Sequence, residues 1–137
     1  YATARDWARF GVLLADKGDW NGVQVLPEDF ATMVGTENPL SQGRYTQALA
    51  WKTGPQDLPN GQFGLPADTF WAQGHDGQSI AIVPSEQLVV VRMGLTPAKL
   101  AYGPEVLVSK ILEASKQMSG DSVEPKDDSL MDPAEEP

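Results

Sequence analysis

Apolar residues recur at helical spacing near the start of the chain, at Trp7, Phe10 and Leu14. Intervals of three and four residues place such side chains on one face of an α-helix. Thr3 and Asp6 have the spacing of a capping box, in which each side chain bonds the other residue's backbone N–H. The pattern predicts a helix over residues 4–17, ended by Gly18 in a left-handed conformation. We assign the apolar stripe to the protein core rather than to a cofactor site.

The next stretch of the chain alternates turn signals with short regular elements. Residues 19–22 have the composition of a turn, and Pro27 with the two acidic residues after it favours a second helix over residues 27–34. A short apolar run predicts a first strand over residues 45–51. Residues 55–68 are rich in Pro and Gly, which predicts a long connection to the next strand.

Two runs rich in Val and Ile give the clearest strand signal. Residues 79–83 and 88–93 are separated by residues 84–87, which contain Pro and polar side chains, so a β-hairpin is predicted. The second run is continuously apolar until Arg92. A strand without polar alternation is buried on both faces, so we expect this strand to be central in its sheet.

A last helix follows the hairpin. Pro104 and Glu105 after Gly103 favour its first turn, and it is expected to end near Gly120. Its predicted apolar stripe consists of Val106, Leu107, Ile111 and Leu112, extended by Ser115 and Met118. The predicted fold is therefore α+β: an antiparallel sheet of C-terminal strands packed against a C-terminal helix and preceded by a helical segment. We expect residues 1–40 to end a helical subdomain, residues 41–118 to form a sheet subdomain, and residues 119–137 to be a tail.

Charge is concentrated at the C-terminal end. The chain carries a net charge of −9, and residues 119–137 contain seven acidic residues against one Lys, a net −6 that leaves −3 for the rest. The tail has too little apolar surface to offset the entropy of ordering, so we expect it to be disordered. The body lacks the basic surface that nucleic acids require, so a nucleic-acid partner is not expected.

Composition narrows the remaining classes. With 41% hydrophobic residues the chain is typical of a globular protein, and it has no apolar run of transmembrane length. It contains no Cys, which excludes disulfides, thiol nucleophiles and zinc–cysteine sites. The chain begins at Tyr1 with a helix signal and without Met, so we expect it to be part of a longer protein.

Several segments also match a known pattern. They are residues 2–11 with 20–22 and 26–27, residues 47–51, residues 74–78, and residues 82–84 with 88–92. Together they resemble the C-terminal part of β-lactamase-related serine hydrolases, the family of class C β-lactamases, penicillin-binding proteins and related esterases. The segment at 47–51 is similar to a Gly-Leu-Gly-Trp strand of that family, with Ala48 and Ala50 replacing the glycines.

The resemblance implies part of a β-lactamase/transpeptidase-like fold and a parent enzyme that forms an acyl-enzyme from an ester, amide or β-lactam. It favours a bacterial periplasmic or other extracytoplasmic location. The chain contains neither Ser-x-x-Lys nor Tyr-x-Asn. We therefore expect it to supply one wall of the active site and no nucleophile, with the N-terminal part of its own parent chain as partner. The alternative is a non-catalytic binding domain on the same scaffold, in which the methyl groups of Ala48 and Ala50 narrow the approach to the sheet.

Family resemblance places the candidate site at residues 74–78. Gly74, Asp76, Gly77 and Gln78 are predicted to bind substrate, because glycines admit a ligand close to the backbone and a backbone N–H can complete an oxyanion hole. His75 is the candidate catalytic residue, which holds a substrate carboxylate or relays a proton. Two placements stay open: His75 lies in the active-site strand, or residues 74–77 form the turn after it, with Asp76 in a local hydrogen bond.

Other candidate groups are weaker. Lys52-Thr53-Gly54 matches the family's Lys-Thr-Gly motif literally, but it precedes the long connection instead of the hairpin, so we interpret it as a strand end. Ser79 is not expected to form a triad with His75 and Asp76, because adjacent side chains on a strand point to opposite faces. We expect no cofactor and no metal, since one His with scattered carboxylates lacks ligand spacing. Trp71 is assigned to the core.

Overall fold

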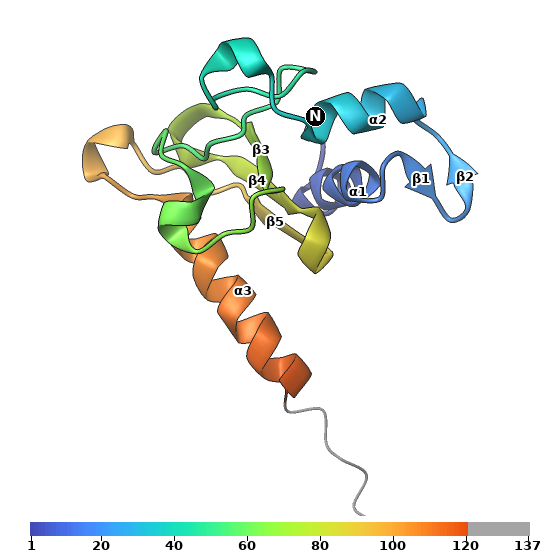
Figure 1. The fold of residues 1–137 in the computed structure, drawn as a ribbon. Coiled ribbons are helices and arrows are strands. Elements are labelled where there is room, and N and C mark those ends of the chain that lie inside the picture. The colour runs from blue at the N-terminus through green and yellow to red at the C-terminus, as the bar shows by residue number, and fades with distance from the viewer. Residues whose placement is uncertain (121–137) are drawn as a thin grey trace, which may run out of the picture.

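The structure is a computed structural model that describes residues 1–120. Its helices are α1 (Ala4–Ala15), α2 (Glu28–Gly35) and α3 (Pro104–Gly120). Its strands are β1 (Asp19–Trp20), β2 (Val23–Gln24), β3 (Phe70–Gln73), β4 (Ser79–Val83) and β5 (Leu88–Arg92). β1 pairs with β2 and β3–β4–β5 form a sheet, all antiparallel (Figure 1). The predicted α+β class, with antiparallel strands and a C-terminal helix, is confirmed.

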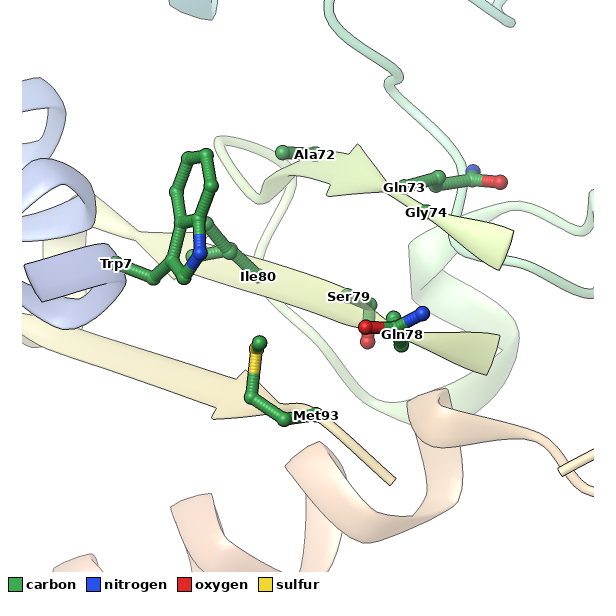
Figure 2. Close-up of a pocket in the computed structure, with 8 residues that line it drawn as sticks. All are labelled: Trp7, Ala72, Gln73, Gly74, Gln78, Ser79, Ile80 and Met93. Carbon is green, nitrogen blue, oxygen red and sulfur yellow. The ribbon is translucent and has the colours of Figure 1, made fainter. Parts of the chain in front are cut away.

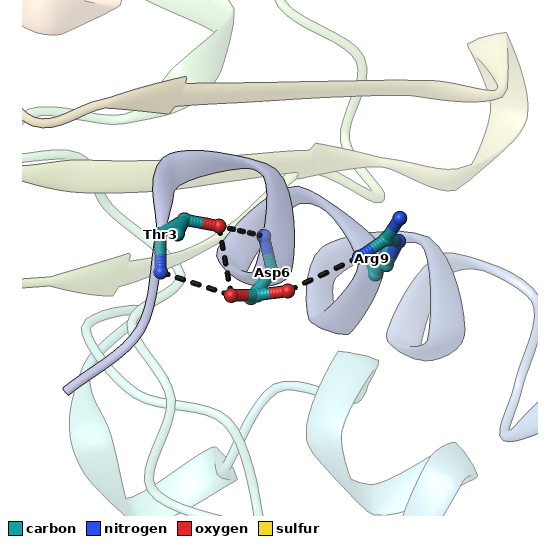
Figure 3. A network of polar contacts seen from close by, with 3 residues as sticks. All are labelled: Thr3, Asp6 and Arg9. Carbon is teal, nitrogen blue, oxygen red and sulfur yellow. Dashed lines mark hydrogen bonds and ion pairs between the residues drawn. The ribbon is translucent and has the colours of Figure 1, made fainter.

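Helix α1 begins at the predicted capping box (Figure 3). Thr3 Oγ1 accepts a hydrogen bond from Asp6 N at 3.1 Å, and the Asp6 carboxylate accepts one from Thr3 N at 3.0 Å. The bonds from the Thr3 hydroxyl and backbone, aided by the Arg9 guanidinium, lower the pKa of the Asp6 carboxyl. The chain leaves the helix through Lys17 and Gly18, which have φ values of 54° and 83°. Both predicted helix signals therefore act where expected.

The apolar stripe of α1 is only partly buried. Leu14 is 6% exposed, but Trp7 and Phe10 are 39% and 43% exposed, so their assignment to the core is wrong. The helix approaches the sheet at Gly11, where an added Cβ would lie 2.5 Å from Val89 Cγ1. Because the closest contact is made where the helix has no side chain, the two aromatic rings lie beside the contact and remain accessible.

A two-stranded ribbon and a short helix follow α1. The predicted turn at residues 19–22 is part of a hairpin, in which Asn21 and Gly22 have φ values of 52° and 82°. Positive φ at both central positions suits the twist of paired strands, and Asn-Gly provides it at low cost. Helix α2 forms at the predicted place, with Pro27 immediately before its first residue.

The apolar run over residues 45–51 forms a tight reversal, so its prediction as a strand is wrong. Thr46 N donates to Ala50 O at 2.8 Å, and Thr46 Oγ1 accepts from Ala50 N at 3.1 Å. Thr46 is buried and bonds Ala50 through both its backbone N–H and its side-chain hydroxyl, which stabilises the reversal. The pattern of hydrophobic residues does not reveal such a contact. Trp51 joins the sheet through a single antiparallel bridge to Trp71 of β3.

The predicted hairpin is confirmed as β4 and β5, but the expected central position of β5 is wrong. The sheet order is β3–β4–β5, so β4 is central. Every residue of β4 is buried, whereas every residue of β5 is half-buried. A hydrophobic run indicates that the faces of a strand are covered, but it does not indicate which strands lie beside it. Here β3 pairs with the edge of β4 that faces away from β5, which leaves β5 at the edge of the sheet.

Two core clusters cover the two faces of the sheet. On the face toward α1 and α2 the buried residues are Leu14, Val34, Phe70, Ile80 and Ile82. On the opposite face, toward α3, they are Leu65, Trp71, Ala81, Val83, Val108 and Leu112. Residues of β4 alternate between the clusters, as the period of a strand requires. The first cluster joins residues 1–40 to the sheet, and Ala48 and Ala50 also pack against it.

Trp71 is the centre of a buried polar network that fixes the long connection. Its side chain is 0% exposed, which confirms its assignment to the core. Trp71 Nε1 donates to Asn60 Oδ1 at 3.0 Å, and Asn60 Nδ2 donates to Lys52 O at 2.7 Å and to Thr69 O at 3.0 Å. One buried amide therefore ties the long connection to the loop at Lys52 and to the start of β3.

Helix α3 packs through its first turns. Leu112 of the predicted stripe is 4% exposed, but Val106 and Met118 of the stripe are 46% and 76% exposed, and Val108 outside it is 1% exposed, so the stripe is only partly correct. The buried face also contains Glu105, whose Oε1 accepts from Gln56 N at 2.6 Å. A search for apolar residues at helical spacing does not include a glutamate, so it missed Glu105 as part of the buried face of α3.

The acidic tail is predicted to be disordered over residues 119–137, of which residues 121–137 lie outside the described residues. Ser119 and Gly120 belong to the end of α3. Among residues 1–120, no helix combines the length and the apolar character needed to cross a bilayer.

Candidate functional site

Residues 74–78 form a tight connection between β3 and β4. Gly74 N donates to Gln78 O at 2.8 Å across the connection, and a 3₁₀ turn of His75–Gly77 lies between them. Asp76 and Gly77 have φ values of 53° and 77°, in the left-handed region. Of the two placements that the sequence left open, residues 74–77 therefore occupy the turn. The Gly74 N–H is bonded within the protein and does not face a ligand.

Arg92, at the end of β5, forms hydrogen bonds that fix this turn. Its Nη1 donates to Gly77 O at 3.1 Å and to Gly94 O, and its Nη2 donates to Thr96 Oγ1. The guanidinium also lies 4.5 Å from the ring centroid of Tyr102, a cation–π distance. An added Cβ on Gly77 would lie 3.2 Å from Nη1. The arginine thus joins the turn to the segment after β5 without a carboxylate partner among the described residues.

A backbone bond strengthens the same connection. Thr96 N donates to Asp76 O at 2.8 Å. The turn at residues 74–78 is therefore fixed at two consecutive carbonyls, those of Asp76 and Gly77. Sequence interpretation missed both Arg92 and Thr96. An arginine at the end of an apolar run usually marks the point where a strand reaches solvent, so Arg92 did not stand out.

His75 projects away from the protein. Its side chain is 87% exposed, and its Nε2 lies 3.2 Å from Asp76 Oδ2. The expectation that these adjacent side chains point apart is wrong, because they lie on a turn and not on an extended strand. Ser79 is buried on β4, and no hydrogen bond joins it to either residue in the part of the chain that is described. The side chains of His75 and Asp76 therefore pair with each other at the tip of the turn, where His75 is exposed and Asp76 is 30% exposed.

A cavity of about 190 Å³ opens beside the turn (Figure 2). It is lined by Trp7 of α1, by Ala72 and Gln73 of β3, by Gly74 and Gln78 of the turn, by Ser79 and Ile80 of β4, and by Met93 after β5. Of the predicted site residues, Gly74 and Gln78 line this cavity, whereas His75, Asp76 and Gly77 do not. The structure thus divides the candidate site into a sheltered edge and an exposed tip.

Trp7 and Met93 are lining residues that the sequence interpretation missed. Trp7 had been assigned to the core by its helical spacing, and Met93 only ends an apolar run. The available signal was the glycine at Gly11, four residues after Trp7. A glycine in mid-helix costs stability and indicates close packing at that position, which moves neighbouring large side chains aside.

Lys52-Thr53-Gly54 lies in the loop after the bridge at Trp51. An added Cβ on Gly54 would lie 2.5 Å from Glu105 Oε1, so the glycine makes room for a buried carboxylate of α3. Thr53 O accepts from Gln73 Nε2 at 2.8 Å, which connects this loop to the end of β3. The glycine of the literal motif thus has a packing reason.

Lys52 itself is half-buried. Its Nζ donates to Ala67 O at 2.9 Å. Desolvation lowers the pKa of the Lys52 ammonium, and the carboxylates of Asp68 and Glu37 oppose this by raising it. Within residues 1–120, no group of three or more His, Asp or Glu residues is arranged to hold a metal ion.

Comparison with known proteins adds little to the geometry. No family model matches the chain, and no solved structure matches it. An uncharacterised protein of Alkalihalophilus pseudofirmus is 30% identical over 100 residues, which cover 67% of this chain and 29% of that protein. The chain therefore spans less than a third of the length of the curated relative that it matches. This similarity carries no information about activity.

Proposed function

We propose that this chain supplies one wall of the active site of a serine hydrolase related to the β-lactamases. The parent enzyme forms an acyl-enzyme from an ester, amide or β-lactam, and the nucleophile comes from another segment of the parent chain. The observation that carries the proposal is the cavity bordered by Gly74 and Gln78 at the β3–β4 connection, where the family resemblance places an active-site edge.

The fixed backbone beside the cavity supports this proposal. An active-site wall acts by presenting groups in one geometry, so that they need no reorganisation during the reaction. Arg92 and Thr96 hold the carbonyls of Gly77 and Asp76, which gives the turn this rigidity. His75 extends from the same turn with an 87% exposed side chain, where a proton relay to a substrate is sterically open.

The open edge of the sheet supports a contribution from the rest of a parent chain. Among the described strands β5 pairs with β4 alone, so one side of its backbone has no strand partner. Its residues Leu88–Arg92 are four apolar side chains followed by Arg92, without the Lys or Pro that protect an exposed edge. An N-terminal strand of the parent chain is the partner that we propose for this edge.

Mass spectrometry after reaction with nitrocefin or nitrophenyl acetate tests the function. We expect no covalent adduct on the 137-residue chain. We expect a stoichiometric acyl adduct on the longer parent protein, at a serine of a Ser-x-x-Lys motif, and its loss when that serine is replaced by Ala. A stoichiometric adduct on a serine of this chain, or none on the parent, contradicts the proposal.

A non-catalytic binding domain is the second candidate function. The observation that favours it is that none of the eight residues lining the cavity is ionisable, so the cavity itself offers no acid or base. The methyl groups of Ala48 and Ala50 give this candidate no support, because they pack against the core cluster instead of narrowing the approach to the sheet. A parent protein that lacks Ser-x-x-Lys and binds these substrates without turnover decides for this candidate.

A further inference from the structure

Apolar side chains form part of the lining of the cavity beside the turn. Trp7 stands over Ile80, and the Met93 side chain points into the same space (Figure 2). Trp7 and Met93 are 39% and 42% exposed, so both present apolar surface to whatever enters. Ala72 of β3 completes the apolar lining. An exposed aromatic ring facing a hollow over a sheet is a contact surface for an apolar group.

The Gly74 N–H and the two glutamine amides beside the cavity are already bonded within the protein, and the Ser79 hydroxyl is a further uncharged polar group of the lining. Gly74 N donates to Gln78 O, and the Gln78 and Gln73 side-chain amides donate to His75 O at 3.0 Å and to Thr53 O at 2.8 Å. No lining residue is charged. A charged group that entered would lose hydration without gaining an ion partner, which is unfavourable. The lining therefore favours an uncharged group.

The size of the cavity limits the group further. Its volume is about 190 Å³. An engineered apolar cavity of about 150 Å³ in another protein binds benzene. The cavity therefore has room for one phenyl ring or a branched aliphatic chain of similar volume.

We propose that this cavity receives an uncharged, phenyl-sized apolar group of the substrate, and that Trp7 is the residue that determines this specificity. The inference rests on the proposed function and names its substrate class: esters or amides that carry a compact apolar group next to the reacting carbonyl. Trp7 forms the wall that the group contacts, with Ile80 and Met93 beside it.

Methyl-resolved NMR on the 137-residue chain tests this directly, with benzyl alcohol as the neutral probe and benzoate and benzylammonium as charged probes. We expect benzyl alcohol to shift the methyl signals of Met93 and Ile80 at millimolar concentration. We expect the two charged probes to bind at least tenfold more weakly. Equal shifts from all three probes, or no shift at these methyl groups, overturn the proposal.

Two substitutions separate Trp7 from a general effect of losing a tryptophan. Trp7→Ala is expected to weaken benzyl alcohol binding about tenfold, and Trp7→Phe by less than threefold. Trp20→Ala is the matched control, since Trp20 is 38% exposed and lies on β1 away from this cavity. Equal loss in Trp7→Ala and Trp20→Ala contradicts the assignment, and Trp7→Phe keeps the test valid if Trp7→Ala fails to fold.

The outcome is independent of catalysis. Binding of the probe without any acyl adduct on the parent protein leaves the pocket assignment standing and removes the hydrolase function. An acyl adduct on the parent without probe binding at Met93 and Ile80 removes the pocket assignment and leaves the function.

Discussion

Strand β4 is flanked by two short connections, residues 74–78 before it and residues 84–87 after it. Each contains a 3₁₀ turn and a non-glycine residue with positive φ, Asp76 at 53° and Gln87 at 48°. Each is also held by charged side chains from a distant part of the chain. Arg92 donates to Gly77 O in the first turn.

In the second connection the charge has the opposite sign. The carboxylate of Asp68 accepts from Ser85 N at 2.7 Å and from Ser85 Oγ at 2.8 Å. Glu86 Oε1 of the same turn lies 3.4 Å from Lys116 Nζ of α3, an ion-pair distance. Two side chains of the second turn, those of Ser85 and Glu86, thus connect it to Asp68 and to α3. In the first turn only backbone carbonyls are used, which leaves the His75 side chain and the neighbouring cavity available to a ligand.

The largest effect is expected from removing the arginine of the first turn. Arg92→Met leaves the carbonyls of Gly77 and Gly94 without their charged donor and is expected to lower the free energy of unfolding by about 2–4 kcal/mol, given about 1.5–3 kcal/mol for a hydrogen bond to a charged group. Urea denaturation measures the loss. Amide exchange is expected to accelerate at residues 74–78 and to be unchanged at residues 84–87.

Arg92→Lys is the matched control for the charge. It keeps the positive charge but lacks the planar fork that reaches the two carbonyls and the Thr96 hydroxyl together, so it is expected to recover less than half of the lost stability. Full recovery by lysine, or equal acceleration of exchange at both turns, contradicts the role given to the fork.

Removing the acid of the second turn is expected to have a smaller effect. Asp68→Ala takes away two bonds to Ser85 in a partly exposed setting, with an expected loss of about 1–2 kcal/mol. Amide exchange should accelerate at Ser85 and not at residues 74–78. Asp68→Asn keeps an acceptor oxygen and is expected to lose less. An unchanged exchange rate at Ser85 in Asp68→Ala refutes the attachment.

Replacing the exposed tip of the first turn should separate function from stability. His75→Ala is expected to change the free energy of unfolding by less than about 0.5 kcal/mol, because the side chain is 87% exposed and exposed pairs contribute little. If the proposed function is right, turnover by the parent protein falls at least tenfold. Glu86→Ala on the second turn is the control, with a similarly small stability change and unchanged turnover. Equal turnover in the two variants removes His75 from the site.

The sequence was informative wherever a local signal and tertiary packing agree. The capping box at Thr3, the hairpin of β4 and β5, and the limits of α3 all follow from residues close together in the chain. It failed where a distant contact decides the outcome. Thr46 turns an apolar run into a reversal, and β3 takes the other side of β4, which leaves β5 at the edge.

The candidate site shows the same division. The sequence pointed to residues 74–78 through a family resemblance, and the structure brings Gly74 and Gln78 of that segment to a cavity. Sequence interpretation did not identify Trp7, which reaches the cavity because Gly11 lets α1 pack closely on Val89. Nor could it supply Arg92, whose partners are carbonyls and carry no residue signature.

The smallest expected effect concerns Asp68, which serves the second turn and also influences Lys52. Desolvation is the main cause that lowers the pKa of Lys52 from its ordinary value of 10.5, and Asp68 raises it. Between the lowered pKa and 10.5 the unfolded state binds more protons than the folded state, so stability rises with pH across this window. Asp68→Asn removes an opposing charge, so the pKa of Lys52 should fall further and the window should widen toward lower pH. NMR titration of the Lys52 side chain measures this, with Glu86→Gln as a control that leaves the pKa of Lys52 unchanged. A rise of that pKa in Asp68→Asn means that the carboxylate does not act on Lys52 through its charge.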